Sequence, residues 1–171
     1  MEQFVNKVAE SGIITFDLAP YVPAEDECVA FDMKPYLFRE MILREKDFRA
    51  ALPTIAWDDY KGKHVALFCS VDAIIPVWAY MLIASNLQPI AASLYFGTVE
   101  EMKKSLVATR LQAIDIAEFA DKRVVIKGCG DIAIPEIAYT TMTYRLRSVA
   151  KSIMYGEPCS TVPIYKRPAG A

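Results

Sequence analysis

Apolar residues recur at helical spacing in two stretches of the chain that lie 59 positions apart. Each stretch opens on a proline and places its apolar residues on one helical face: Pro76, Ala79, Tyr80, Ile83, Leu87 and Pro135, Ala138, Tyr139, Met142, Leu146. This spacing predicts two amphipathic helices, each with its proline at the first helical position. Short apolar runs before the helices, at 64–70 and 123–129, predict buried strands, and the runs at 91–96 and 150–155 predict second strands.

These elements belong to an internal repeat. Aligned without gaps, residues 63–97 match residues 122–156 at 11 of 35 positions, where about two matches are expected by chance. The chain therefore divides into a leader (1–38), two copies (39–97 and 98–156) and a tail (157–171). Each copy has the order α-β-α-β, and strand–helix–strand units give parallel strands. The sequence predicts an α/β protein in which residues 1–171 form a single domain by duplication, with helices packed on a mainly parallel sheet.

Two local signals add detail to this plan. Thr98 and Glu101 have the spacing of a capping box, which predicts that the first helix of copy two begins there. In the leader, the pattern Phe-Asp…Pro-Tyr occurs at 16–21 and again at 31–36. We interpret these segments as two short strands, paired with each other or with the sheet edge, whose aromatic residues pack and whose prolines stop the strands.

Composition and charge argue against several classes of protein. Residues 65–85 contain one charge, Asp72, and are long enough to span a bilayer, but copy two is charged from Arg123 to Lys151, so we expect a soluble protein. Lysine and arginine number 19 against 21 aspartate and glutamate, a net charge of −2, which argues against nucleic-acid binding. The N-terminus lacks the basic start and apolar run of a signal peptide, so we expect a cytoplasmic location.

The candidate chemistry lies in the cysteines. Cys69, Cys129 and Cys159 each follow a predicted strand, and the carboxyl ends of parallel strands share one edge of a sheet. Thiolates select zinc or iron, so we expect these three residues to hold one such metal. The fourth ligand would be water or one of three carboxylates: Asp72, Asp131 or Glu157. An open fourth position would permit catalysis, and the sequence leaves open whether the protein is an enzyme.

A second interpretation stands beside the metal site. Cysteines often only pack in a core, and the aspartates that precede the two helices are typical of helix caps. The protein would then be a non-catalytic small-ligand-binding or homo-oligomeric module, with an interface in the apolar first copy around Trp78, Tyr80 and Met81. The chain has one histidine, His64, at the strand end opposite the cysteines, where we expect it to be exposed.

Three segments carry a resemblance to a known family: residues 69–82 around Cys69, Lys127-Gly128-Cys129, and residues 152–163 with Gly-Glu-Pro-Cys-Ser-Thr-Val-Pro. On these segments the chain resembles DUF2480, a bacterial family of uncharacterised proteins, over nearly its whole length. The family has no established activity, so the resemblance implies no mechanism and marks only Cys69, Cys129 and Cys159 as site positions. The loop at 130–133 departs from the more polar run typical of the family.

Overall fold

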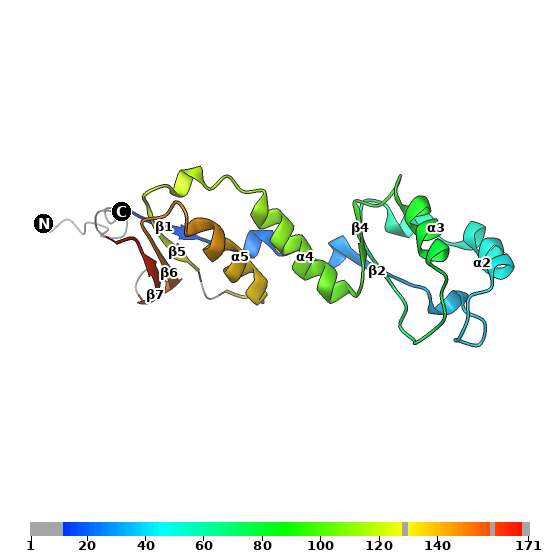
Figure 1. Ribbon diagram of the computed structural model, residues 1–171. Helices are drawn as coiled ribbons and strands as arrows, with labels where there is room; N and C mark the ends of the chain where they lie inside the picture. The colour runs from blue at the N-terminus through cyan, green and yellow to red at the C-terminus, as the bar shows by residue number, and fades with distance from the viewer. Residues whose placement is uncertain (1–11, 128–129, 158–159, 169–171) are drawn as a thin grey trace, which may run out of the picture. The chain divides into compact units, whose positions relative to one another are not determined.

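The computed structural model describes residues 12–127, 130–157 and 160–168, and these residues fall into two compact units (Figure 1). One unit comprises Pro23–Lys103, and the other combines Met1–Val22 with Lys104–Ala171. We call them the inserted unit and the terminal unit. Each contains helices packed on a sheet made mainly of parallel strands, so the predicted α/β class is confirmed.

The inserted unit contains a three-stranded parallel sheet in the order β2-β3-β4. Its strands are β2 (Cys28–Asp32), β3 (His64–Phe68) and β4 (Ser93–Phe96), and its helices are α2 (Glu45–Ala51) and α3 (Val77–Leu87). Apolar residues of the strands and helices form one buried cluster, which includes Phe31, Phe48, Leu67, Ile83 and Leu87. The cluster explains the helical spacing seen in the sequence, because Ala79, Ile83 and Leu87 are the buried residues of α3.

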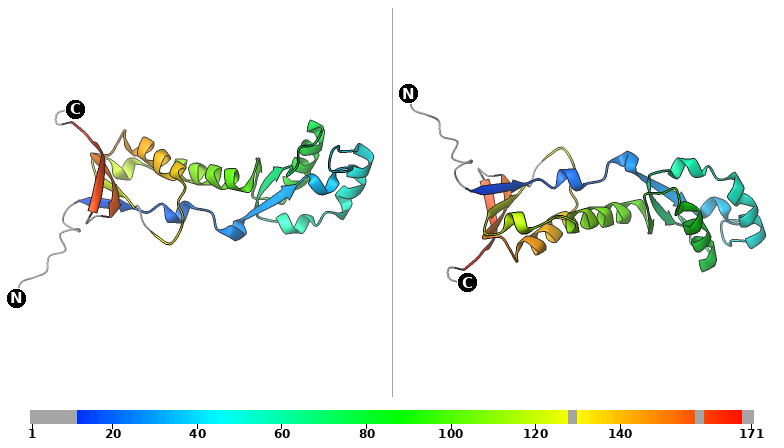
Figure 2. Two further views of the ribbon diagram at one scale, coloured as in Figure 1. Left: turned by 90° about the horizontal axis from the view of Figure 1, so that it is seen from below. Right: turned by 90° about the horizontal axis from the view of Figure 1, so that it is seen from above.

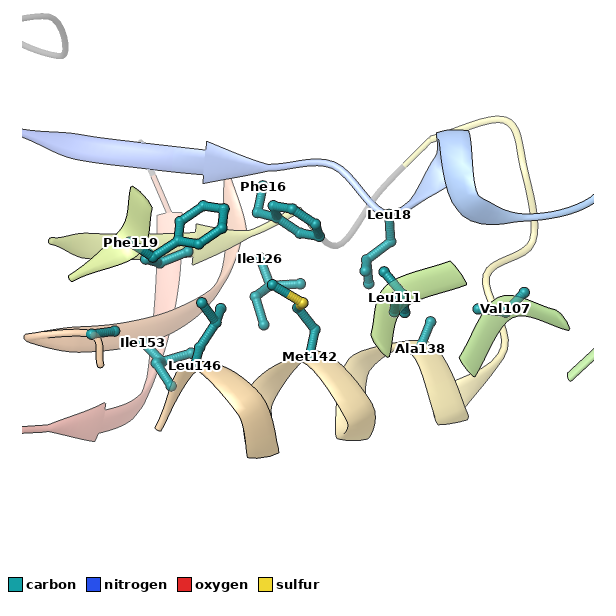
Figure 3. Close-up of a cluster of buried hydrophobic side chains, with 12 residues drawn as sticks. Phe16, Leu18, Val107, Leu111, Phe119, Ile126, Ala138, Met142, Leu146 and Ile153 are labelled. Atoms are coloured by element: carbon teal, nitrogen blue, oxygen red, sulfur yellow. The ribbon is translucent and has the colours of Figure 1, made fainter. Parts of the chain in front are cut away.

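The terminal unit contains a four-stranded sheet in the order β1-β5-β6-β7. Its strands are β1 (Ile13–Phe16), β5 (Arg123–Ile126), β6 (Ser152–Glu157) and β7 (Ser160–Lys166). The first three are parallel and β7 is antiparallel to β6, beside which it lies in Figure 2. Helix α5 (Glu136–Leu146) directs Met142 and Leu146 toward the sheet, where they meet Ile126 and Ile153 (Figure 3).

Helix α4 (Val99–Gln112) begins at the predicted residue. The Thr98 N–H donates to Glu101 Oε2 over 2.8 Å, and the Glu101 N–H donates back to Thr98 Oγ1 over 3.3 Å. These two bonds are the reciprocal pair of a capping box, so that prediction is confirmed. The boundary between the two units falls within α4, after Lys103.

The two sheets have the same strand register at fixed sequence offsets. Phe31, Leu67 and Phe96 are consecutive Cα partners across the inserted unit, and Phe16, Ile126 and Tyr155 are the corresponding partners in the terminal unit. The offset is 59 for the second and third strands and 15 for the first, as in the sequence repeats. The duplication, the single domain and the copy boundaries at 39–97 and 98–156 stay predictions.

Several details differ from the sequence predictions. The strands form two sheets rather than one, and the leader strands β1 and β2 pair with β5 and β3, not with each other. Pro76 and Pro135 are the N-cap residues that precede α3 and α5, because their extended backbone lies just outside the helix.

The tail forms β7, which pairs with β6. No helix in the described part of the chain is long and apolar enough to cross a membrane.

Candidate functional site

The structure describes one of the three predicted metal-binding cysteines. Cys69 follows β3, is half-buried, and packs against the apolar cluster of the inserted unit. Cys129 and Cys159 lie outside the described residues. The prediction that the three cysteines follow strands of one sheet is wrong, because β3 belongs to one sheet and β5 and β6 belong to the other. Among the described residues, no three histidine, cysteine, aspartate or glutamate side chains come together as a metal site.

The carboxylates proposed as fourth ligands are also placed. Asp72 and Asp131 are exposed, and neither has a hydrogen-bond partner among the described residues, so the capping role considered for them is not seen. Glu157 is half-buried at the end of β6. The thiolate site therefore stays a prediction that rests on Cys69 and two residues outside the described part.

A different carboxylate organises the loop that contains Cys69. Asp32 Oδ1 accepts the backbone N–H of Ser70 over 3.0 Å and that of Lys34 over 2.9 Å, and Asp32 Oδ2 accepts the Ser70 hydroxyl over 2.5 Å. Burial alone would raise the pKa of Asp32, but these hydrogen bonds and the charge of Lys34 outweigh it and lower that pKa. Asp32 therefore ties the loop after β3 to the end of β2.

His64 is half-buried rather than exposed, which corrects the sequence prediction. It lies between Cys28 and Ser93 in a row of Cα partners across the inserted sheet. Its Nδ1 is 2.7 Å from Ser93 Oγ, and its Nε2 is 3.9 Å from a Glu27 carboxylate oxygen. The 3.9 Å separation is too long for a hydrogen bond, and Glu27 Oε1 accepts the N–H of Ala24 instead. The arrangement is therefore a Ser–His hydrogen bond that joins β3 to β4, not an assembled Ser-His-Glu triad.

The corresponding row of the terminal sheet borders a cavity of about 520 Å³. Ile13, Arg123, Ser152 and Lys166 are consecutive Cα partners across all four strands. Their side chains share the face opposite α5, since successive residues in a strand alternate faces and Ile153 lies on the α5 side. The cavity thus lies at the amino ends of β1, β5 and β6. We call it the basic pocket.

Four cations line the basic pocket, and three of them have no partner within the part of the chain that the structure describes. Arg123, Lys151 and Lys166 form no ion pair or hydrogen bond with any described residue through their charged groups. The described residues that line the cavity include no aspartate or glutamate. The fourth, Arg167, is held in place: its guanidinium donates to the Asp121 carboxylate and, over 2.7 Å, to the Val149 carbonyl. The hydrogen bond to Asp121 raises the pKa of Arg167, so this group stays charged.

The remaining lining gives the basic pocket polar and apolar parts. The hydroxyl of Ser152 can donate a hydrogen bond, and Ile13, Met154 and Pro163 supply apolar surface. The Tyr165 ring lies on the other face of the sheet, because Tyr165 is the Cα partner of Ile153 and packs against the core on the α5 side, where the Arg147 guanidinium lies 3.7 Å from its centre. Cations beside the apolar side chains of Ile13, Met154 and Pro163 suit a small anion that carries an apolar group.

Sequence reasoning missed this pocket because it searched the carboxyl ends of the strands. In the sequence, the charges of Arg123 and Lys151 argue only against a membrane span. A usable signal was present: 59 residues earlier the corresponding positions are His64 and Ala92, so the charges of Arg123 and Lys151 have no counterpart in copy one. What the sequence does not reveal is that β7 brings Lys166 and Arg167 to the same edge.

Comparison with known proteins gives one match. The sequence model of a family described as "Protein of unknown function (DUF2480)" matches residues 2–167. No curated protein and no solved structure matches the chain significantly.

Proposed function

The chain belongs to this family of proteins of unknown function, and we propose its function from the geometry of the basic pocket. The protein is a non-catalytic binding module for a small organic anion, a phosphate or carboxylate joined to an apolar group. The observation that carries this proposal is the convergence of three cations, Arg123, Lys151 and Lys166, on one cavity in which no described residue pairs with them and no described acid is part of the lining.

Charge and shape together support this ligand class. A free phosphate or carboxylate would accept charge-assisted hydrogen bonds from the three cations and from the Ser152 hydroxyl. The apolar group would lie against Ile13, Met154 and Pro163. A cavity of about 520 Å³ is within the size range of small-ligand sites.

The lining favours binding over catalysis. The described residues around the basic pocket include no histidine, cysteine, aspartate or glutamate to act as a general base or nucleophile partner. The Ser152 hydroxyl has no base within the lining to activate it, so it would serve as a hydrogen-bond donor.

The test is calorimetric titration with phenyl phosphate, inorganic phosphate and phenol. We expect phenyl phosphate to bind more tightly than inorganic phosphate, and phenol not to bind, because both the charge and the ring are needed. Arg123→Gln and Lys166→Gln should each weaken phenyl phosphate binding about tenfold, through loss of one charge-assisted hydrogen bond. Raising the salt concentration should weaken binding by the wild-type protein as well.

Lys122→Gln is the matched control. Lys122 adjoins Arg123 in the chain and is exposed, but it does not line the cavity, so its loss should leave the affinity within about twofold, as for an exposed charge outside the site. Equal affinity in all three variants, or no binding of phenyl phosphate at millimolar concentration, would refute the proposal. Release of phenol during the titration would show catalysis and refute the non-catalytic part.

A further inference from the structure

The outer edge of β4 is open in the inserted unit. Among the described residues, no strand pairs with β4 on the side away from β3, so β4 ends the sheet. In the terminal unit the strand at the matching register, β6, is covered on that side by β7. An open edge presents unpaired backbone N–H and C=O groups to any strand that approaches.

Residues at the same register position in β4 and β6 differ in exposure, because β6 has a covering strand and β4 has none among the described residues. Leu94 is the Cα partner of Val65 and is 39% exposed, whereas Ile153, the partner of Val124, is 0% exposed. The difference follows the covering strand, because Ile153 lies opposite Tyr165 of β7, and Tyr165 packs against the core of the terminal unit. Leu94 has a core position without the strand that would bury it.

Phe96 extends the same apolar face to the edge. Across the row Phe31, Leu67 and Phe96, the exposed fraction is 1%, 2% and then 68%. The Phe96 ring meets Tyr80 of α3 edge-on with ring centres 5.0 Å apart, as Tyr155 meets Tyr139 of α5 at 5.7 Å. The Phe96–Tyr80 pair is therefore the last aromatic contact on the α3 side of the sheet before its outer edge.

We infer that the β4 edge pairs with β4 of a second copy of this chain, as antiparallel strands about a two-fold axis. The pairing of β7 with β6 shows which side chains suit a strand at this position. On β7, the aromatic Tyr165 lies opposite the aliphatic Ile153, and the aliphatic Val162 lies opposite the aromatic Tyr155. A strand that pairs with β4 should likewise place an aromatic residue opposite Leu94 and an aliphatic residue opposite Phe96.

The β4 strand of a second copy provides these aromatic and aliphatic residues by symmetry. With Tyr95 on the two-fold axis, Leu94 lies opposite Phe96 of the second copy, and Phe96 lies opposite Leu94 of the second copy. Residues opposite each other in an antiparallel pair share a face, so both contacts fall on the α3 side of a continuous six-stranded sheet. The pairing is isologous and closed, which limits assembly to a dimer.

This geometry refines the interface expected from the sequence around Trp78, Tyr80 and Met81. Tyr80 borders the proposed seam through its contact with Phe96. Trp78 instead packs inward, with its ring 6.2 Å from that of Phe48. Met81 is exposed on α3 and lies one residue beyond Tyr80. The seam thus needs Leu94 and Phe96, which the sequence did not single out.

The test is the mass of the protein in solution, measured by sedimentation from low to high micromolar concentration. We expect a concentration-dependent dimer whose dissociation constant rises at least tenfold in Leu94→Lys and in Phe96→Lys, because edge lysines oppose strand pairing. Met41→Lys is the matched control, since Met41 is as exposed as Phe96 and belongs to the same unit but not to the edge. It should dimerise like the wild type, and circular dichroism should show all three variants folded.

Hydrogen exchange supplies a second measurement that does not depend on a variant. The outward backbone amides of β4 should exchange more slowly at dimer concentrations than at monomer concentrations. A wild-type monomer at every concentration, a dimer insensitive to both lysine variants, or β4 amides unaffected by dimerisation would each overturn the inference. So would a monomer whose β4 edge binds a peptide copying residues 160–166, which would assign the edge to an extended peptide.

Discussion

The recurrent Phe-Asp…Pro-Tyr pattern shows how single side chains end a strand in this protein. In each occurrence the aspartate accepts the N–H two residues later, Asp17 from Ala19 and Asp32 from Lys34, both over 2.9 Å. The aromatic residues stack, with ring centres 5.7 Å apart for Phe16 and Tyr21 and 5.8 Å for the second pair. The predicted aromatic packing of this pattern is confirmed.

The hydrogen bonds to Asp32 lead to a prediction about stability and pH. Because they lower the folded pKa of Asp32, their contribution is present above the unfolded pKa of about 3.9 and is lost as pH falls through the folded pKa. Asp32→Ala should therefore reduce the free energy of unfolding at pH 7 by about 2 kcal/mol. The difference from wild type should shrink toward pH 2, as measured by urea denaturation.

Asp17→Ala is the comparison for this residue. The described partners of Asp17 are one backbone N–H, from Ala19, and Lys127 Nζ at 3.5 Å, whereas Asp32 accepts three hydrogen bonds, two of them from Ser70. Replacement of Asp17 should cost less, about 1 kcal/mol. A loss at pH 7 that is equal for both variants and does not change with pH would contradict the role assigned to Asp32.

At the scale of an element, α4 begins where its capping box places it. Thr98→Ala removes the acceptor of the Glu101 N–H, and we expect the free energy of unfolding to fall by about 1 kcal/mol. Thr109→Ala is the control of matched type, because Thr109 lies inside α4 and its hydroxyl donates only to the Ser105 carbonyl. That change should be neutral or slightly stabilising, since alanine is the better helix former. The measurement is urea denaturation, and equal losses in the two variants would contradict the capping role.

At the scale of the whole molecule, the thiolate hypothesis is tested by metal content. It predicts about one equivalent of zinc or iron in protein purified anaerobically without chelators, and loss of that metal in Cys159→Ser. Cys28→Ser is the control, because Cys28 belongs to β2 and is not one of the predicted ligands. Metal that survives the Cys159 change, or no metal in the wild-type protein, would reject the site. The measurement is elemental analysis.

The parts of the fold that local pattern controls were predicted from the sequence. The two strand–helix–strand segments, the start of α4 and the α/β class follow from apolar spacing and capping residues that act within a few positions. The candidate site was not found in this way. The four cations of the basic pocket come from three separate segments, and only strand pairing brings Arg123, Lys151 and Lys166 to one cavity.

The sequence by itself determined which segments become strands and helices and which face of each is apolar, because these properties depend on neighbours within one or two turns of chain. Only the tertiary structure decided how the strands are shared between two sheets, that β7 covers β6 while no described strand covers the outer edge of β4, and that Arg123, Lys151 and Lys166 line one cavity. These outcomes depend on pairing between segments far apart in the chain. The residues of a strand determine which of its faces is apolar, but they do not determine which strand it pairs with.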